Sequence, residues 1–246
     1  MKARADQLLV DRGLVESRAK GQALILAGLV YSGERKVEKA GQGMAADAPL
    51  EVRGKEHPWV SRGGVKLAHA LEHFDWDVAG AVALDVGSST GGFTDVLLEK
   101  GAAKVFAVDV GTNQLAWKLR QDPRVAVHEQ TNARYLTDDI VTEPVDIVVC
   151  DASFISLAKV LDTALDFAKP GGRLVALVKP QFEAERGEIG KGGVVRDPEV
   201  HERVCRAAAQ WVESRGWTVA GVVQSPITGP EGNVEFLLAA ERSAAP

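Results

Sequence analysis

The spacing of apolar and polar positions changes several times along this chain, and the changes mark its predicted elements. From residue 63 onward, apolar runs typical of buried strands cover residues 81–86, 104–109, 125–129, 145–150 and 173–178. Stretches with a helical pattern lie among them, over residues 65–73, 92–100, 115–120 and 157–168. Such alternation of strands and helices predicts a parallel sheet with helices packed against it.

Two more apolar runs, residues 218–223 and 234–240, close the pattern. The connection between them is too short for a crossover helix, so these two strands are expected to pair antiparallel. Five parallel strands followed by an antiparallel hairpin resemble the sheet of class I methyltransferases, which is a Rossmann-like α/β fold. We expect this fold over residues 63–246.

The first 55 residues follow another pattern, in which two short helices precede several short strands. Ser17 is a favourable N-cap because its hydroxyl can accept from free backbone N–H groups, and Gly28 ends the second helix. The pattern is carried by Arg4, Ala5, Asp6, Leu8, Leu9, Ser17, Arg18, Ile25, Gly28, Val30 and Gly33. It resembles the S4 RNA-binding domain. We expect a small α/β S4-like domain at residues 1–55 and a linker at residues 56–62.

Composition narrows the class of protein. Of the 246 residues, 46% are hydrophobic and 26% are charged, as in ordinary soluble domains. The longest apolar run, residues 23–30, is far too short to span a bilayer. Two distant cysteines and five scattered histidines show no disulfide or metal-ligand spacing. We expect a cytoplasmic monomer without a membrane anchor or a metal ion.

Charge is distributed unevenly between the two parts. Residues 1–66 contain 12 Lys and Arg against 8 Asp and Glu, and the remaining residues contain 17 against 26, which gives the net charge of −5. A local positive excess is a modest indication of a polyanionic partner, although an ordinary solvated face also explains it. In S4 domains, a helix pair presents basic side chains to RNA. By that resemblance, the candidate RNA-binding residues are Arg4, Arg18, Lys20, Lys36 and Arg62.

A glycine-rich turn, DVGSSTGGF at residues 85–93, follows the first strand predicted for the large sheet. Glycines allow close approach of a ligand, and open parallel sheets bind ligands at the carboxyl ends of their strands. The spacing is G-x-x-x-G-G and not the G-x-G-x-x-G of dinucleotide sites. Because Asp85 adds negative charge, the turn favours a cationic cofactor such as S-adenosylmethionine over a pyrophosphate.

Polar residues at neighbouring strand ends extend the predicted cofactor site. Asp109 follows the second strand, where a carboxylate can accept from ribose hydroxyls. Asn132 follows the third strand and could bond an adenine amino group, although asparagine is also common in turns. The candidate cofactor-binding residues are Asp85, Gly87, Ser89, Gly91, Gly92, Phe93, Asp109, Val110, Asn132, Ala133 and Asp151.

Four ionisable residues that are distant in the sequence form the predicted catalytic set. Asp151 and Lys179 follow the fourth and fifth strands, whose carboxyl ends should be neighbours. Lys66 lies in the helix before the first core strand, and Glu235 is expected within the last strand. A purely structural ion-pair network is the alternative, but ionisable groups gathered at strand ends favour function.

These four residues belong to a set of seven short sequence blocks that is distributed over nearly the whole chain. The blocks are VSRGGVK at 60–66, GSSTGGFT at 87–94, DVGTNQLAW at 109–117, TNAR at 131–134, DASFISL at 151–157, VKPQFE at 178–183 and GNVE at 232–235. Together they resemble the TlyA family, called haemolysin-like in older naming, among the FtsJ-like ribose 2′-O-methyltransferases. The resemblance implies S-adenosylmethionine as cofactor, ribosomal RNA or a ribosomal subunit as partner, and 2′-O-methylation of cytidine as activity.

The same resemblance assigns catalysis to Lys66, Asp151, Lys179 and Glu235, and the chemistry fits. A ribose hydroxyl must lose its proton as it attacks the methyl group, and Lys179 is the candidate base. Nearby Lys66 and partial burial would favour the neutral amine of Lys179, whereas Asp151 would favour its ammonium while orienting it. Glu235 would hold one lysine or the ribose.

Several features leave alternatives open. Phe154 and Phe182 flank the expected site and could stack on the target base, but core packing is the favoured explanation for Phe154. The glycine-rich segment 180–196 could close over RNA or be a passive connection. Trp59 could couple RNA docking to cofactor binding or simply pack against one domain. The chain ends soon after its last strand, as in the short form of the family, which implies large-subunit RNA as the target.

Three other functions compete with this interpretation. An NAD-linked oxidoreductase is disfavoured by the glycine spacing and by Asp85. A catalytically silent RNA-binding protein is disfavoured by the complete set of two lysines and two carboxylates. A membrane-lysing haemolysin is disfavoured because the sequence shows no span, no signal and no strongly amphipathic basic helix.

Overall fold

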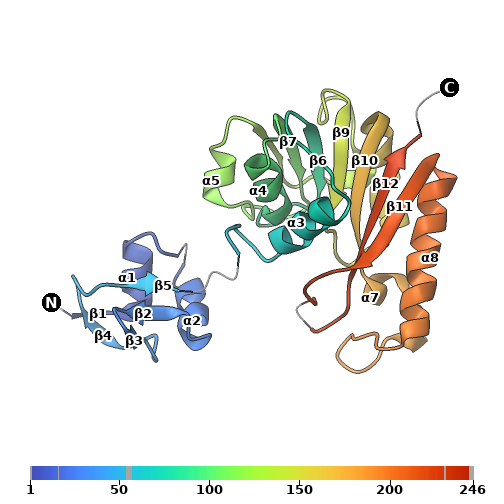
Figure 1. Ribbon diagram of the computed structural model, residues 1–246. Helices are drawn as coiled ribbons and strands as arrows, with labels where there is room; N and C mark the ends of the chain where they lie inside the picture. The colour runs from blue at the N-terminus through green and yellow to red at the C-terminus, as the bar shows by residue number, and fades with distance from the viewer. Residues whose placement is uncertain (1, 16, 54–56, 230, 244–246) are drawn as a thin grey trace. The chain divides into compact units, whose positions relative to one another are not determined.

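The computed structural model describes residues 2–15, 17–53, 57–229 and 231–243. Within these ranges the chain divides into two compact units, one up to Pro58 and one from Trp59 onward (Figure 1). The expected end of the first domain at residue 55 and the expected start of the linker at residue 56 lie outside the described residues. Trp59, which the sequence placed in the linker, belongs to the second unit.

The described part of the first unit combines two helices with two small antiparallel sheets. Its elements are β1 (Lys2–Arg4), α1 (Ala5–Asp11), α2 (Arg18–Leu26), β2 (Val30–Ser32), β3 (Arg35–Lys36), β4 (Gly43–Ala45) and β5 (Glu51–Val52). β1 pairs with β4, and β2 pairs with both β3 and β5. The first helix begins at Ala5, because the preceding Arg4 pairs with Gly43 in the β1–β4 ladder. Ser17 caps α2 as expected, accepting from the Lys20 N–H.

Seven strands form one sheet in the described part of the second unit, in the order β11-β12-β10-β9-β6-β7-β8. They are β6 (Val82–Val86), β7 (Lys104–Val108), β8 (Val125–His128), β9 (Val145–Cys150), β10 (Ala168–Val178), β11 (Trp217–Gln224) and β12 (Phe236–Arg242). Strands β6 to β10 run parallel, and β12 is antiparallel to both of its neighbours. The predicted class I methyltransferase sheet with its antiparallel hairpin is confirmed.

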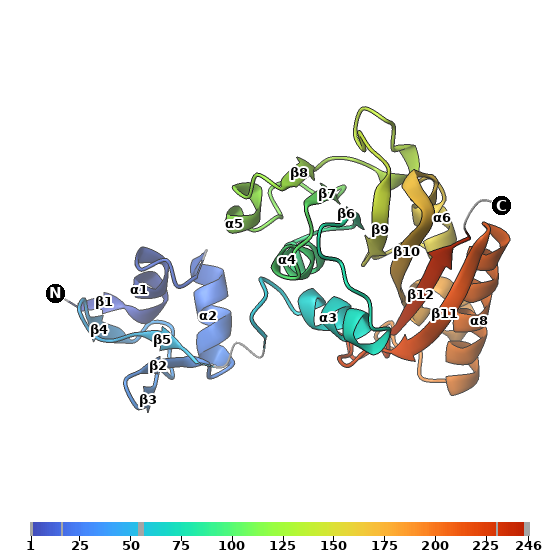
Figure 2. The same ribbon diagram turned by 45° about the horizontal axis from the view of Figure 1, so that its top comes forward.

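Helices cover both faces of this sheet (Figure 2). They are α3 (Gly63–His73), α4 (Gly92–Glu99), α5 (Trp117–Arg120), α6 (Leu157–Leu161), α7 (Pro180–Glu183) and α8 (Pro198–Ser214), with 3-10 turns at Ala133–Tyr135, Ala164–Phe167 and Arg186–Glu188. Alternate strand residues face opposite sides: Ala83 packs in the core with α3 and α4, whereas Leu84 packs in the core with α6 and α8. Burial on both faces explains why the strand sequences are mostly apolar and do not alternate with polar residues.

Two expected helices are shorter in the structure. The helix expected at residues 115–120 begins at Trp117, and the N–H groups of Gln114 and Leu115 before it donate to the Glu129 carboxylate. The helix expected at residues 157–168 ends at Leu161, and a 3-10 turn follows at Ala164–Phe167. The Thr163 hydroxyl, between the two, donates to the Arg134 carbonyl.

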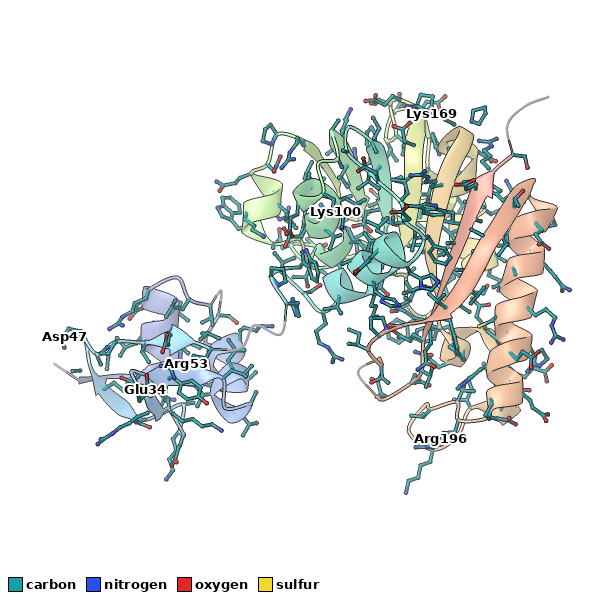
Figure 3. All side chains as sticks on the ribbon, viewed as in Figure 1. Glu34, Asp47, Arg53, Lys100, Lys169 and Arg196 are labelled. Atoms are coloured by element: carbon teal, nitrogen blue, oxygen red, sulfur yellow. The ribbon has the colours of Figure 1, made fainter. Side chains whose placement is uncertain are left out.

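The parallel strands end at one common edge of the sheet, and the segment before α3 is fixed beside it. The indole N–H of Trp59 donates to Glu99, and the Val60 N–H donates to Asp95, so both residues are held by α4. Lys169 marks the opposite edge, at the start of β10 (Figure 3). Packing of Trp59 on α4 is therefore shown, whereas its coupling of RNA and cofactor binding stays a prediction.

Candidate active site

The two lysines and two carboxylates expected to cooperate meet at the carboxyl edge of the sheet. Lys66 Nζ lies 2.6 Å from Glu235 Oε2 and 3.6 Å from Asp151 Oδ2. Lys179 Nζ lies 2.7 Å from Asp151 Oδ1. The charges alternate along this chain of contacts, and Asp151 joins the two amines. The convergence that the sequence could only propose is thus a feature of the structure.

Burial makes these contacts strong. Lys66 and Lys179 are each 7% exposed and Glu235 is 2% exposed, so water screens their charges little. Lys66 stands on α3, while Asp151 and Lys179 follow β9 and β10. Glu235 lies one residue before β12, so its expected place inside the last strand is wrong. The β10–β12 register begins with Phe236 opposite Val178, which leaves Glu235 beyond the ladder and free to reach Lys66.

Lys179 has further partners that sequence reasoning missed. Its ammonium donates to the Ser153 hydroxyl at 2.7 Å and to the Asp151 carbonyl at 3.2 Å. The amine is therefore fixed by three oxygen atoms on one loop, the segment that follows β9. The signal for Ser153 was its place inside the DASFISL block, two residues beyond Asp151.

Two glycines of the turn lie in close contact with other segments of the protein. A Cβ on Gly91, whose φ is +98°, would lie 2.7 Å from Leu115 Cδ1, and one on Gly92 would lie 2.8 Å from the Gly64 nitrogen. A side chain at either position would push away the chain that frames the turn. The Phe93 side chain is buried in the core, so only its main chain is placed to face a ligand. Packing thus explains part of the glycine pattern that sequence alone attributed to a cofactor.

Asp85 is fully buried beside the turn. Its Oδ2 accepts from the Thr94 hydroxyl at 2.6 Å, and its Oδ1 has no hydrogen-bond partner among the described residues. Burial raises the pKa of Asp85 to about 7, and the nearby Asp151 charge acts in the same direction. A carboxylate held in this way is a favourable counter-charge for a cation that enters the turn.

We expect Asp85→Asn to flatten the dependence of stability on pH. Because the folded-state pKa of Asp85 is raised from 3.8 to about 7, its protonated form favours folding at low pH, and that contribution is lost as pH rises toward 7. The wild type should lose about 2–3 kcal/mol more than the variant between pH 5 and pH 8. Denaturant unfolding at the two pH values measures this, with exposed Asp138→Asn as the control. Equal slopes for Asp85→Asn and the wild type would contradict the buried-acid assignment.

The remaining candidate cofactor residues lie along the same edge. Asp109 accepts from the N–H groups of Ser89 and Gly111, at 2.8 and 2.7 Å, and thereby ties the turn to the end of β7. Asn132 caps the following 3-10 turn by accepting from the Arg134 N–H. Gly87 lies against Ala152 in the loop after β9. The Val110 side chain is 71% exposed, whereas that of Ala133 is buried.

Glu129 is a second residue that sequence reasoning missed. Its carboxylate accepts from three successive N–H groups, those of Asn113, Gln114 and Leu115, and it pairs with Arg120. The Arg120 guanidinium and these N–H groups lower the pKa of Glu129 to about 2. Glu129 thus holds the loop after β7 in place as an anion. Its position at the end of the strand run 125–129 was the available signal.

Phe154 contradicts the expectation that it packs in the core. Its φ is +65°, in the left-handed region that bulky side chains rarely adopt, and it is 89% exposed. Its ring touches Phe182, with the ring centroids 5.1 Å apart. The unusual backbone conformation turns the ring outward beside Lys179 and Asp151. Exposed aromatics next to reactive groups are suited to stacking on unpaired bases.

In the first unit, Asp6 organises two of the candidate RNA-binding arginines. This fully buried carboxylate accepts two hydrogen bonds from Arg4, each at 2.9 Å, and one from Arg18 at 3.3 Å. Hydrogen bonding from Arg4 holds the pKa of Asp6 well below its usual range. Both guanidinium groups remain about half exposed. Lys20 and Lys36 are exposed on the same unit.

Other basic side chains serve the structure. Arg53 binds Glu34, Glu51 and the Gly33 carbonyl and stays in the first unit (Figure 3). The Arg12 guanidinium donates to the Ala46 and Ala48 carbonyls. In the second unit, Arg62 is exposed and donates to the Thr228 carbonyl at 3.2 Å.

The residues at the sheet edge fit a cationic nucleoside cofactor. Asp85, Asp109 and Asp151 end or follow three adjacent strands, and Asp85 keeps one buried oxygen without a partner in the described part of the chain. The described residues contain no group of three or more His, Cys, Asp or Glu arranged to hold a metal ion. Among the same residues, no helix has the length and apolarity needed to cross a bilayer.

The strand order and the antiparallel hairpin of this sheet are those of the S-adenosylmethionine-dependent methyltransferase fold. Superposition on solved structures shows the same fold. One such methyltransferase, from Mesorhizobium loti, superposes with a TM-score of 0.52 over 71% of this chain and 96% of its own, at 16% identity. A protein of Streptococcus thermophilus named as a candidate hemolysin superposes with a TM-score of 0.78 over 100% of this chain and 90% of its own, at 43% identity.

The family follows from sequence comparison. Residues 59–242 match the profile of FtsJ-like methyltransferases. The 16S/23S rRNA (cytidine-2'-O)-methyltransferase TlyA of Mycobacterium tuberculosis is 50% identical over 238 residues, which cover 96% of this chain and 89% of that protein. The chain therefore belongs to the FtsJ-like methyltransferases and, among them, to the TlyA family, as the seven sequence blocks predicted.

Proposed function

We propose that this protein transfers a methyl group from S-adenosylmethionine to the 2′-hydroxyl of a cytidine in ribosomal RNA. One observation carries the proposal: Lys66, Asp151, Lys179 and Glu235 converge at the strand edge that also bears the glycine turn. The relative from Mycobacterium tuberculosis is named as an rRNA (cytidine-2'-O)-methyltransferase, which supports the same substrate class. In this proposal the four converging residues are catalytic, as the sequence predicted.

S-adenosylmethionine would supply an electrophilic methyl group on a sulfonium, held by the turn at residues 85–93 and by Asp109 and Asn132. The methyl group would pass to the ribose oxygen, and the uncharged thioether of the cofactor would be the leaving group. Lys179, once neutral, accepts the hydroxyl proton, and Ser153 and Asp151 direct its nitrogen. Lys66 and Glu235 fix Asp151 from the other side. Positioning of the two reacting atoms supplies several kcal/mol of the rate.

RNA docking is assigned to the first unit and to the rim of the active site. Arg4 and Arg18 are pre-oriented by Asp6 and remain open to phosphates, as counterion release requires. In this proposal Lys20 and Lys36 add positive charge on the first unit, and Arg62 adds it on the second unit. Phe154 provides a face on which the target base can stack. We assign residues 1–55 an S4-like role on these grounds.

Methyl incorporation tests the proposal directly. We expect purified protein with labelled S-adenosylmethionine to label ribosomal RNA within isolated subunits, and mass mapping to place the label on a cytidine ribose. Separate large and small subunits decide the target, because the name of the Mycobacterium tuberculosis relative covers both 16S and 23S rRNA. RNA with a 2′-deoxycytidine at the mapped position is the control. Binding of RNA without any label would favour the silent RNA-binding protein instead.

A further inference from the structure

Two segments form the rim of the site and contact each other at several points. The first comprises residues 151–157 after β9, and the second comprises Lys179 and the helix α7 that follows it. Lys179 donates to Ser153, Phe182 touches Phe154, and the Leu157 N–H donates to Glu183 Oε1 at 2.7 Å. The last contact has no role in the mechanism given above.

Glu183 acts as the N-cap of a helix to which it does not belong. Ser156 occupies the capping position of α6, yet its hydroxyl makes no capping hydrogen bond. The Glu183 carboxylate takes over that task across the loop by accepting from Leu157. Because this cap comes from α7, it fixes the start of α6 relative to α7, and a cap from within the α6 segment cannot do this. Glu183 is half-buried, and burial raises its pKa.

The capped segment contains the strained residue of the rim. Phe154 has a φ of +65°, a strained conformation that persists only where neighbouring contacts impose it. Those contacts lie on both sides of it: Lys179 holds Ser153, and Glu183 holds Leu157. Asp151 depends less on them, because its own N–H donates to the Val86 carbonyl at the end of β6.

We propose that Glu183 is a positioning residue, which holds residues 153–157 so that Phe154 presents its ring to the target base. The inference rests on the proposed RNA methylation. Glu183 touches neither cofactor nor reacting atoms and acts through the loop. Its loss should therefore weaken productive RNA binding more than the chemical step, and it should leave cofactor affinity unchanged.

Steady-state methylation of ribosomal subunits by the full chain tests this role. We expect Glu183→Ala to lower kcat/KM about ten-fold, chiefly through KM for RNA, which is the scale of losing one well-placed cap. Glu183→Gln keeps a carbonyl oxygen at the capping position and should stay within about two-fold of the wild type. Asp197→Ala is the matched control: it removes the cap of a different helix, α8, where Asp197 accepts from the Glu199 N–H.

A double-mutant cycle separates positioning from a general loss of stability. If Glu183 acts through Phe154, Glu183→Ala should add no further loss in a Phe154→Ala background. Additive losses, or a Glu183→Ala enzyme as active as the wild type, would overturn the inference.

Hydrogen exchange of the Leu157 amide gives a readout that needs no activity. It should be faster in Glu183→Ala and unchanged in Asp197→Ala. If the wild type methylates no RNA but exchange is still faster in Glu183→Ala, the proposed function is refuted and the capping role of Glu183 stands. If exchange is unchanged in Glu183→Ala, the capping role is refuted.

Discussion

Lys179→Ala should lower the rate of methyl transfer about 10²- to 10⁴-fold, the range that a positioned general base contributes. The amine of Lys179 contacts Asp151 and Ser153, which both lie in the loop after β9. Its removal takes away the proton acceptor but leaves Asp151 paired with Lys66. The glycine turn is untouched, so calorimetry should show unchanged affinity for S-adenosylmethionine. Single-turnover methylation of ribosomal subunits measures the chemical step itself.

Two further variants decide what kind of help Lys179 gives. Lys179→Arg keeps the positive charge but cannot accept a proton, so it should be as inactive as alanine if Lys179 is a base. Lys169→Ala is the matched control, because Lys169 and Asp146 form a 2.8 Å ion pair on the same two strands at the opposite edge of the sheet. It should methylate normally. An active Lys179→Arg enzyme would show that charge, and not proton transfer, is what Lys179 supplies.

The sheet was predictable because its physics is local. Runs such as residues 147–150 are apolar throughout, since both faces of a central parallel strand are buried. The short connection before β12 then forced antiparallel pairing. The ends of α5 and α6 could not be predicted, because the apolar pattern over residues 115–120 and 157–168 continues past the points where the two helices begin and end.

The sequence predicted which residues converge in the site, because strand ends in a parallel sheet share one edge. It did not predict the individual contacts within the site. Ser153 and Glu183 lie within two of the sequence blocks, but nothing in the sequence shows that Ser153 binds Lys179 or that Glu183 binds the Leu157 N–H. Phe154 was assigned to the core because aromatic residues are usually buried, and its positive φ has no signature in a residue other than glycine or asparagine. Roles that depend on backbone conformation require coordinates.

Lys66→Met should destabilise the second unit by about 3–5 kcal/mol, because it leaves the buried Glu235 carboxylate without its cation. In a unit of this size, that corresponds to a fall in Tm of roughly 10 °C. Glu235→Leu should cost less, since Lys66 keeps Asp151 at 3.6 Å. Arg206→Ala is the control: its partner Glu202 lies one helical turn away on the exposed face of α8, and such pairs contribute about 0.5 kcal/mol or less.

The double variant Lys66→Met with Glu235→Leu separates stability from function. Replacing a buried ion pair by apolar side chains of similar volume is often neutral, so most of the lost stability should return. Methylation should not return, because Asp151 loses the partner that balances Lys179. Denaturant unfolding and labelled-methyl transfer, measured on the same preparations, give both answers. A stable and active double variant would mean that Lys66 and Glu235 serve the fold alone. A stable and inactive one would show that this pair is retained for the geometry it imposes on Asp151.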